Sequence, residues 1–253
     1  MLGLGVLPVQ GPLAKKPTVK EDGDLPVPNV NNKKDKYEAF AISLPFCRIN
    51  IKKYEQQIKD AHKACGNEGW VTLEELAKVF TTPAWAGLSD ESSKLSRVLL
   101  SHAFCEDEGR IKVEALYVMG VLCCPDPPNV KAFSLYNVLQ DGGIQENEFI
   151  AAGDKDFPPT WNLLVKLSTV HLFEWCKTID DYDGPFTEDQ QQSLVDCVDD
   201  HLDDFLDIVF GDEAKLSYKD FITKSIEKKA NYIYDINSMR ASVFTFAKVP
   251  YSF

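Results

Sequence analysis

The sequence predicts an all-α fold of four helix–loop–helix units in two pairs, with extended N- and C-terminal tails. Apolar residues recur at three- and four-residue spacing through most of the chain, as on one face of a helix. A short turn motif also recurs four times between the expected helices. The predicted organisation is a tail over 1–45, a first pair over 46–125, a second pair over 126–230 with an insertion at 154–186, and an extended segment over 231–253.

The first 45 residues are expected to be extended. They contain six of the fourteen prolines, with glycine, asparagine and lysine between them, and such a composition does not pack into a core. The apolar start Met1–Leu7 is too short for a signal peptide and lacks its basic residues. Residues 1–20 hold lysines and no acids, so a mitochondrial presequence remains an alternative.

The clearest predicted helix, 188–209, has an apolar stripe on one side and acids on the other. The stripe consists of Leu194, Val195, Val198, Leu202, Phe205, Leu206 and Val209. The acidic face consists of Asp196, Asp199, Asp200, Asp203 and Asp207. We interpret this face as solvated surface, with the binding of a basic partner as the alternative.

The recurring motif begins with an acid, which is usually followed by a glycine. One further residue, an aliphatic residue and, five positions later, a second apolar residue complete it. Its four copies are NEGWVTLEEL (67–76), DEGRIKVEAL (107–116), QDGGIQENEF (140–149) and DEAKLSYKDF (212–221). In two copies a capping box or a close variant begins the next helix, with Thr72 and Glu75 in one and Ser217 and Asp220 in the other. Four copies with the same spacing indicate repeated structural units.

The motif follows the plan of the EF-hand calcium loop. A glycine at the sixth position makes the turn, a carboxylate at the twelfth is bidentate, and the first, third and fifth positions supply oxygens. The aliphatic at the eighth position is expected to pair with its counterpart in the partner loop. Three loops have lost ligands, because other residues occupy ligand positions: Ala64 and Gly66 in the first, Phe104 and Ala115 in the second, and Val209 in the fourth. In the fourth loop Ala214 also replaces the turn glycine.

The third loop, 137–148, keeps most of its calcium ligands. Its predicted metal ligands are the side chains of Asn137, Asp141 and Glu148 and the backbone carbonyl of Gly143. Leu139 takes the place of one ligand, so we expect weak Ca²⁺ binding or none.

An acidic segment follows at 180–190. We interpret it as a turn before a helix that Thr187 caps, with a fifth calcium-type loop as the alternative.

Charge and cysteine content narrow the function further. A net charge of −12 argues against nucleic acid as the main partner, and no apolar run is long enough to span a membrane. The seven cysteines, an odd number without a CxxC pair, are expected to be reduced thiols of an intracellular protein. His62–Cys65 and His102–Cys105 have a spacing that hints at zinc, but we interpret both pairs as helix-end residues. The four histidines are predicted not to form a metal set.

Four segments carry a resemblance to a known family: CGNEGWVTLEEL from Cys65, HAFCEDEGRIKVEALYVMGVL from His102, VKAFSLYNVLQDGGIQENEF from Val130 and FLDIVFGDEAKLSYKDFITKSIEKKANYI from Phe205. Over roughly 50–235 the chain resembles the four-EF-hand family of neuronal calcium sensors, calcineurin B and calaxin-like proteins, with degenerate loops. The resemblance implies paired EF-hands. Kinship with the calaxin-like members implies a ciliary location with a dynein or microtubule partner.

The sequence therefore predicts a non-catalytic structural or adaptor subunit of a larger assembly, largely independent of calcium, with the ciliary axoneme favoured. A calcium sensor using loop 137–148 and an accessory subunit of a mitochondrial complex are the alternatives. An enzyme is not expected, because no phosphate loop, GxSxG or HExxH motif occurs. The predicted partner groove is lined by Leu116, Met119, Val121 and Leu122.

Overall fold

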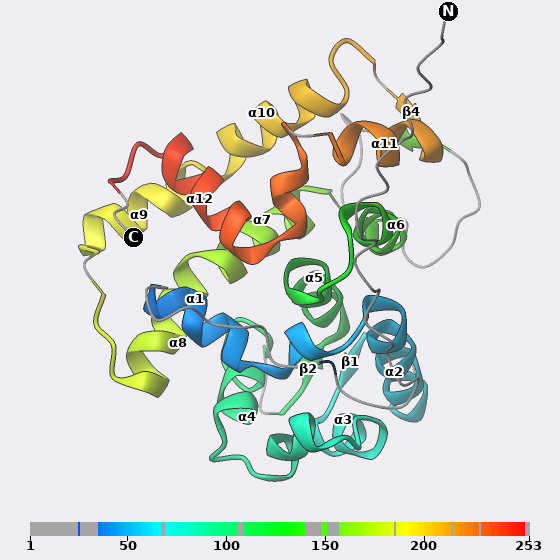
Figure 1. Ribbon diagram of the computed structural model, residues 1–253, viewed down its shortest axis with the longest axis vertical. Helices are drawn as coiled ribbons and strands as arrows, with labels where there is room; N and C mark the ends of the chain where they lie inside the picture. The colour runs from blue at the N-terminus through cyan, green and yellow to red at the C-terminus, as the bar shows by residue number, and fades with distance from the viewer. Residues whose placement is uncertain are drawn as a thin grey trace, which may run out of the picture.

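The computed structural model describes residues 25, 35–66, 69–105, 109–139, 148–150, 157–184, 186–213, 215–227 and 229–250. The described chain is mostly helical, which confirms the all-α class. Helices α5 and α7 lie at the centre, and α2, α6, α8, α10 and α12 pack around them (Figure 1). Within this part of the chain, no helix combines the length and apolar character needed to cross a membrane.

The first half of the chain runs from α1 to the central α5. Its elements are α1 (Lys36–Ser43), η1 (Pro45–Arg48), α2 (Ile51–Ala64), β1 (Trp70–Val71), α3 (Leu73–Val79), η2 (Pro83–Ser89), α4 (Lys94–Leu99), β2 (Ile111–Lys112) and α5 (Val113–Cys123). Helix α5 is apolar on nearly every side, and such a helix is stable only inside a core.

The second half of the chain runs from α6 to α12. Its elements are α6 (Pro128–Leu139), β3 (Glu148–Ile150), α7 (Phe157–Ser168), α8 (Val170–Asp180), α9 (Glu188–Asp196), α10 (Val198–Val209), β4 (Lys215–Ser217), α11 (Tyr218–Ser225), η3 (Asn231–Tyr234) and α12 (Ile236–Phe246). The helix predicted over 188–209 is divided at Cys197 into α9 and α10. Buried side chains from both halves form one continuous apolar cluster.

Two antiparallel ladders join the loops in pairs. Strand β1 pairs with β2 with Val71 opposite Ile111, which confirms the expected partnership of these two aliphatic residues. Strand β3 pairs with β4, but Leu216 lies opposite Phe149. Ile144, the expected partner of Leu216, lies outside the described residues. The apolar pattern alone cannot choose this register, because Ile144 and Phe149 are both apolar and five positions apart.

The predicted helix starts after these ladders are also confirmed. The Thr72 hydroxyl accepts a hydrogen bond from the Glu75 amide, and the Ser217 hydroxyl accepts one from the Asp220 amide. Each hydroxyl satisfies an amide that has no partner within its own helix. Local sequence is therefore sufficient to place these two helix starts.

The N-terminal tail predicted over 1–45 is wrong for residues 36–43, which form α1. The Asp35 carboxylate caps this helix by accepting from the Glu38 amide at 2.6 Å. Tyr37 and Phe40 are buried, and the Tyr37 ring lies 4.5 Å from that of Phe173 on α8. Burial against a distant helix offsets the cost of ordering this short segment, which proline and glycine content does not reveal.

The extended C-terminal segment predicted over 231–253 is likewise wrong for 231–246, which form η3 and α12. The Asp235 carboxylate caps α12 by accepting from the Ser238 amide. Arg240 on α12 is fully buried, and its guanidinium lies 3.1 Å from the Asp35 carboxylate. This ion pair joins the two segments that the sequence indicated as free tails.

The predicted insertion 154–186 supplies two central helices, α7 and α8. Trp161 on α7 and Trp175 on α8 are among the largest fully buried side chains. At the junction, the hydroxyls of Ser168 and Thr169 both donate to the Val165 carbonyl, which satisfies these two buried polar groups. The segment is therefore part of the core, and the helix pairs pack against it.

Candidate functional site

The predicted calcium ligands fall in different structural settings. Asn137 lies near the end of α6, and its buried side-chain oxygen has no hydrogen-bond partner within the described part of the chain. Asp141 and Gly143 lie outside the described residues. Glu148 lies in β3, where its backbone is paired opposite Ser217, and the exit helix α7 begins only at Phe157. The four-ligand calcium set therefore remains a prediction.

The residues predicted to line a partner groove are core residues. Leu116, Met119, Val121 and Leu122 are each 0–2% exposed, within a helix that is buried on nearly all sides. The Tyr54 hydroxyl from α2 also donates to the Leu116 carbonyl at 3.0 Å. These side chains present no open groove, because α2, α6 and α7 cover α5.

The acidic segment 180–190 forms a turn followed by a capped helix, as expected. The Thr187 hydroxyl accepts from the Gln190 amide, and the Gln190 side chain accepts from the Thr187 amide, which completes a capping box. Asp180 is paired with Lys94 at 2.8 Å, and Asp183 with Lys177 at 3.0 Å. Two of the acids in this turn are thus engaged with lysines.

Helix α10 presents the predicted acidic face to solvent. We define the acidic surface as the exposed carboxylates of Asp199, Asp200, Asp203, Asp204 and Asp207. None of them forms an ion pair with any residue that the structure describes. Like charges three or four residues apart on a helix repel one another, so this surface is electrostatically unbalanced.

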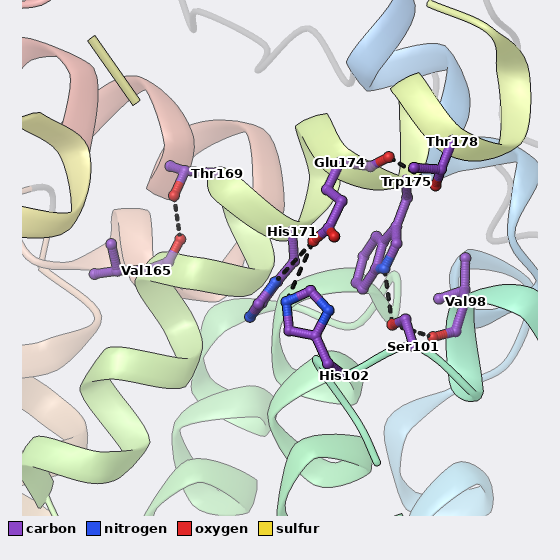
Figure 2. Close-up of polar contacts among 9 residues, drawn as sticks. All are labelled: Val98, Ser101, His102, Val165, Thr169, His171, Glu174, Trp175 and Thr178. Atoms are coloured by element: carbon purple, nitrogen blue, oxygen red, sulfur yellow. Dashed lines mark hydrogen bonds and ion pairs between the residues drawn. The ribbon is translucent and has the colours of Figure 1, made fainter. Parts of the chain in front are cut away.

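The structure brings together two histidines that the sequence indicated as scattered. His102 lies in the turn after α4, while His171 and Glu174 lie one helical turn apart on α8 (Figure 2). The Glu174 carboxylate lies 3.3 Å from His102 Nε2 and 3.7 Å from His171 Nδ1. The two rings meet edge to face with centroids 4.9 Å apart. Two of the four histidines thus lie together beside one carboxylate, because the fold brings α8 against this turn.

The three side chains of the cluster differ in solvent exposure, from the buried His171 to the mostly exposed His102. The His171 side chain is 11% exposed, that of Glu174 is 40% exposed and that of His102 is 65% exposed. Desolvation, helped by the nearby His102 and Lys166, lowers the pKa of His171 to about 4. His171 is therefore neutral at physiological pH. Its buried Nδ1 has no hydrogen-bond partner among the described residues.

Hydrogen bonds beside the cluster fix its backbone. The Trp175 indole donates to the Ser101 hydroxyl at 2.9 Å, and that hydroxyl donates to the Val98 carbonyl at 2.6 Å (Figure 2). The Thr178 hydroxyl donates to the Glu174 carbonyl at 2.9 Å. Residues adjacent to His102 and Glu174 are thus linked to each other, so α8 and the turn keep one relative position.

The HxxC spacings noted in the sequence have other structural roles. The Cys105 thiol donates to the Leu99 carbonyl, and burial raises its pKa. The His62 Nε2 accepts from the Gly69 amide at 3.0 Å, which closes the first loop. All seven cysteines are free thiols, as expected.

The sequence signal for the cluster of His102, His171 and Glu174 was the spacing of His171 and Glu174, which places both on one helix face. Only the fold supplies His102.

Comparison with protein-family models, with curated proteins and with solved structures finds no match to this chain. The likeness to EF-hand proteins consequently rests on the motif residues alone. Function has to be inferred from the geometry of the chain itself.

Proposed function

We propose that the protein is a non-catalytic structural or adaptor subunit that binds a protein partner within a larger assembly, largely without calcium. The observation that carries this proposal is the burial of Phe104 and Ala115, which occupy the first and twelfth positions of the second loop. At these positions a calcium loop needs oxygen ligands. Here the side chains are apolar and belong to the core.

Apolar packing replaces metal ligation in the first pair of loops. Val71 and Ile111 pair across the ladder, and both side chains are fully buried. Phe104 stacks on Trp175 of α8 with ring centroids 5.8 Å apart. Contacts of this kind hold the loops closed at any calcium concentration. A fixed scaffold is the role that suits them.

The acidic surface on α10 is the proposed contact with the partner. Its five carboxylates share one helix face without ion pairs to described residues, so they carry mutual repulsion that a basic segment would relieve. Opposite charge also accelerates association and orients the partner. A lysine- or arginine-rich protein segment is therefore the partner class that this surface fits.

The ciliary axoneme is the assembly that we propose first, on the resemblance to calaxin-like proteins. An accessory role in a mitochondrial complex is the second assignment. Cross-linking and affinity purification of the tagged full chain from ciliated cells distinguishes them. Dynein or tubulin among the captured proteins would support the first, and subunits of a mitochondrial complex would support the second.

The docking proposal is tested by a charge-neutralising variant in the same purification. We expect Asp199→Asn, Asp203→Asn and Asp207→Asn together to lose the partner. The matched control carries Asp60→Asn, Glu74→Gln and Glu91→Gln, which neutralise three exposed acids on other helices and loops. Equal recovery of the partner by both variants would contradict docking on α10. A chain recovered alone as a monomer would contradict the adaptor role itself.

A calcium sensor is the second candidate, favoured by one observation. The buried side-chain oxygen of Asn137 has no hydrogen-bond partner among the residues that the structure describes, and a bound cation would supply one. Calorimetric titration of the full chain with millimolar Ca²⁺ tests this candidate, with Asn137→Ala as the variant. Absence of heat and of any change in melting temperature would exclude it.

A further inference from the structure

We propose that His102, His171 and Glu174 bind one divalent transition-metal ion, with Zn²⁺ as the best fit, and that this ion ties α8 to the turn after α4. The inference is independent of the adaptor role and of the calcium loops. It rests on the positions of three ligand atoms, on a buried imidazole nitrogen without a described hydrogen-bond partner and on a hydrogen bond between residues next to two of the ligands.

The ligand spacing matches a tetrahedral centre. Bonds of about 2.0–2.1 Å at tetrahedral angles place neighbouring ligand atoms about 3.3–3.5 Å apart. The Glu174 oxygen lies 3.3 Å from one histidine nitrogen and 3.7 Å from the other. One ligand atom from each of the three side chains lies within 4.8 Å of the other two. The His102 side chain is 65% exposed and so has room to rotate toward the other two ligands.

The ligand types select the ion. Two imidazoles and one carboxylate suit Zn²⁺ and related transition metals, whereas Ca²⁺ and Mg²⁺ require oxygen-rich sites. His171 faces the Glu174 carboxylate with its Nδ1, at 3.7 Å. Its buried Nδ1 also lacks any other described partner. An ion in this position would satisfy that nitrogen.

The surrounding structure holds the ligands ready. Trp175, which follows Glu174, is buried and bonded to Ser101, which precedes His102. This hydrogen bond holds the backbone that carries Glu174 next to the backbone that carries His102. The three protein ligands leave the fourth position of a tetrahedral ion to water, on the exposed side where His102 and Glu174 reach solvent. A cross-link between α8 and the turn is the expected effect.

The test uses the full chain after removal of bound metal with a chelator. We expect calorimetry to show saturable binding of one Zn²⁺ per chain. The melting temperature should rise when Zn²⁺ is added, and binding of Ca²⁺ or Mg²⁺ to these three residues should not raise it. Substitution with Co²⁺ should give visible bands of a nitrogen–oxygen site without the intense near-ultraviolet band of a thiolate ligand.

Variants assign the site. His102→Gln and Glu174→Gln change partly exposed side chains and should each weaken Zn²⁺ binding at least about tenfold, the scale that even outer partners of a metal ligand reach. Circular dichroism checks that both variants fold. Cys105→Ser and His62→Gln are matched controls that remove the HxxC alternatives and should bind as the wild type does. Undiminished binding by the first two variants, a thiolate band, or no binding with Zn²⁺ in large excess would overturn the proposal.

Discussion

Replacement of Gly120 by alanine should destabilise this protein, although the same change in a helix interior ordinarily stabilises. Gly120 lies within α5, and a helix gains about 1 kcal/mol when alanine replaces glycine. Here a Cβ atom at this position would lie 2.6 Å from Cε1 and 2.7 Å from Cδ1 of the Tyr54 ring. Carbon atoms pack no closer than about 3.5 Å at their optimum.

The Tyr54 ring cannot move away without cost. It is 1% exposed, its hydroxyl donates to the Leu116 carbonyl, and the Phe80 and Trp85 rings lie 5.7 and 6.1 Å from it. Overpacking in such a core costs about 1–3 kcal/mol. Set against the propensity gain of about 1 kcal/mol, the net loss should reach up to about 2 kcal/mol, or up to roughly 8 °C in melting temperature for a chain of this size.

Thermal and urea unfolding of a double-mutant cycle provide the assay. Gly120→Ala should lower stability in the wild-type chain but raise it in the Tyr54→Ala background, where the clash is gone and only the helix propensity remains. The reasoning would be refuted if Gly120→Ala stabilised the wild-type chain. Equal effects in the two backgrounds would show that the ring of Tyr54 is not the cause.

Three further predictions follow from buried polar groups. Burial lowers the pKa of His201 from 6.5 to about 4. The unfolded chain therefore binds a proton at higher pH than the folded chain, so about 3 kcal/mol of folding free energy is present in full above pH 6.5 and is lost as the pH falls through 4. Urea titrations should show a flatter pH dependence of stability in His201→Leu. Asp35→Ala removes the carboxylate that pairs with the buried Arg240 at 3.1 Å and the cap of α1, and should cost about 3–5 kcal/mol in urea unfolding. Ser101→Ala leaves the Trp175 indole without its acceptor and should cost about 1–3 kcal/mol by the same measurement, whereas Ser92→Ala, at an exposed turn, should change stability little.

The sequence by itself determined the helical class, several helix starts and one loop pairing. Helix α10 buries Leu202, Phe205 and Val209 because residues three and four apart share a helix face. The caps at Thr72, Ser217 and Thr187 lie where the sequence placed them. Signals of this kind are local, since each depends on residues within one or two helical turns.

Only the tertiary structure decided which distant segments meet. Helices α1 and α12 form because Tyr37 and Arg240 are buried against other elements, and no local pattern contains those elements. His102 reaches His171 for the same reason, although the sequence indicated four unrelated histidines. Burial also turned the expected groove on α5 into core and reversed the expected effect of alanine at Gly120. Contacts between remote positions depend on the path of the whole chain, which periodicity and spacing do not encode.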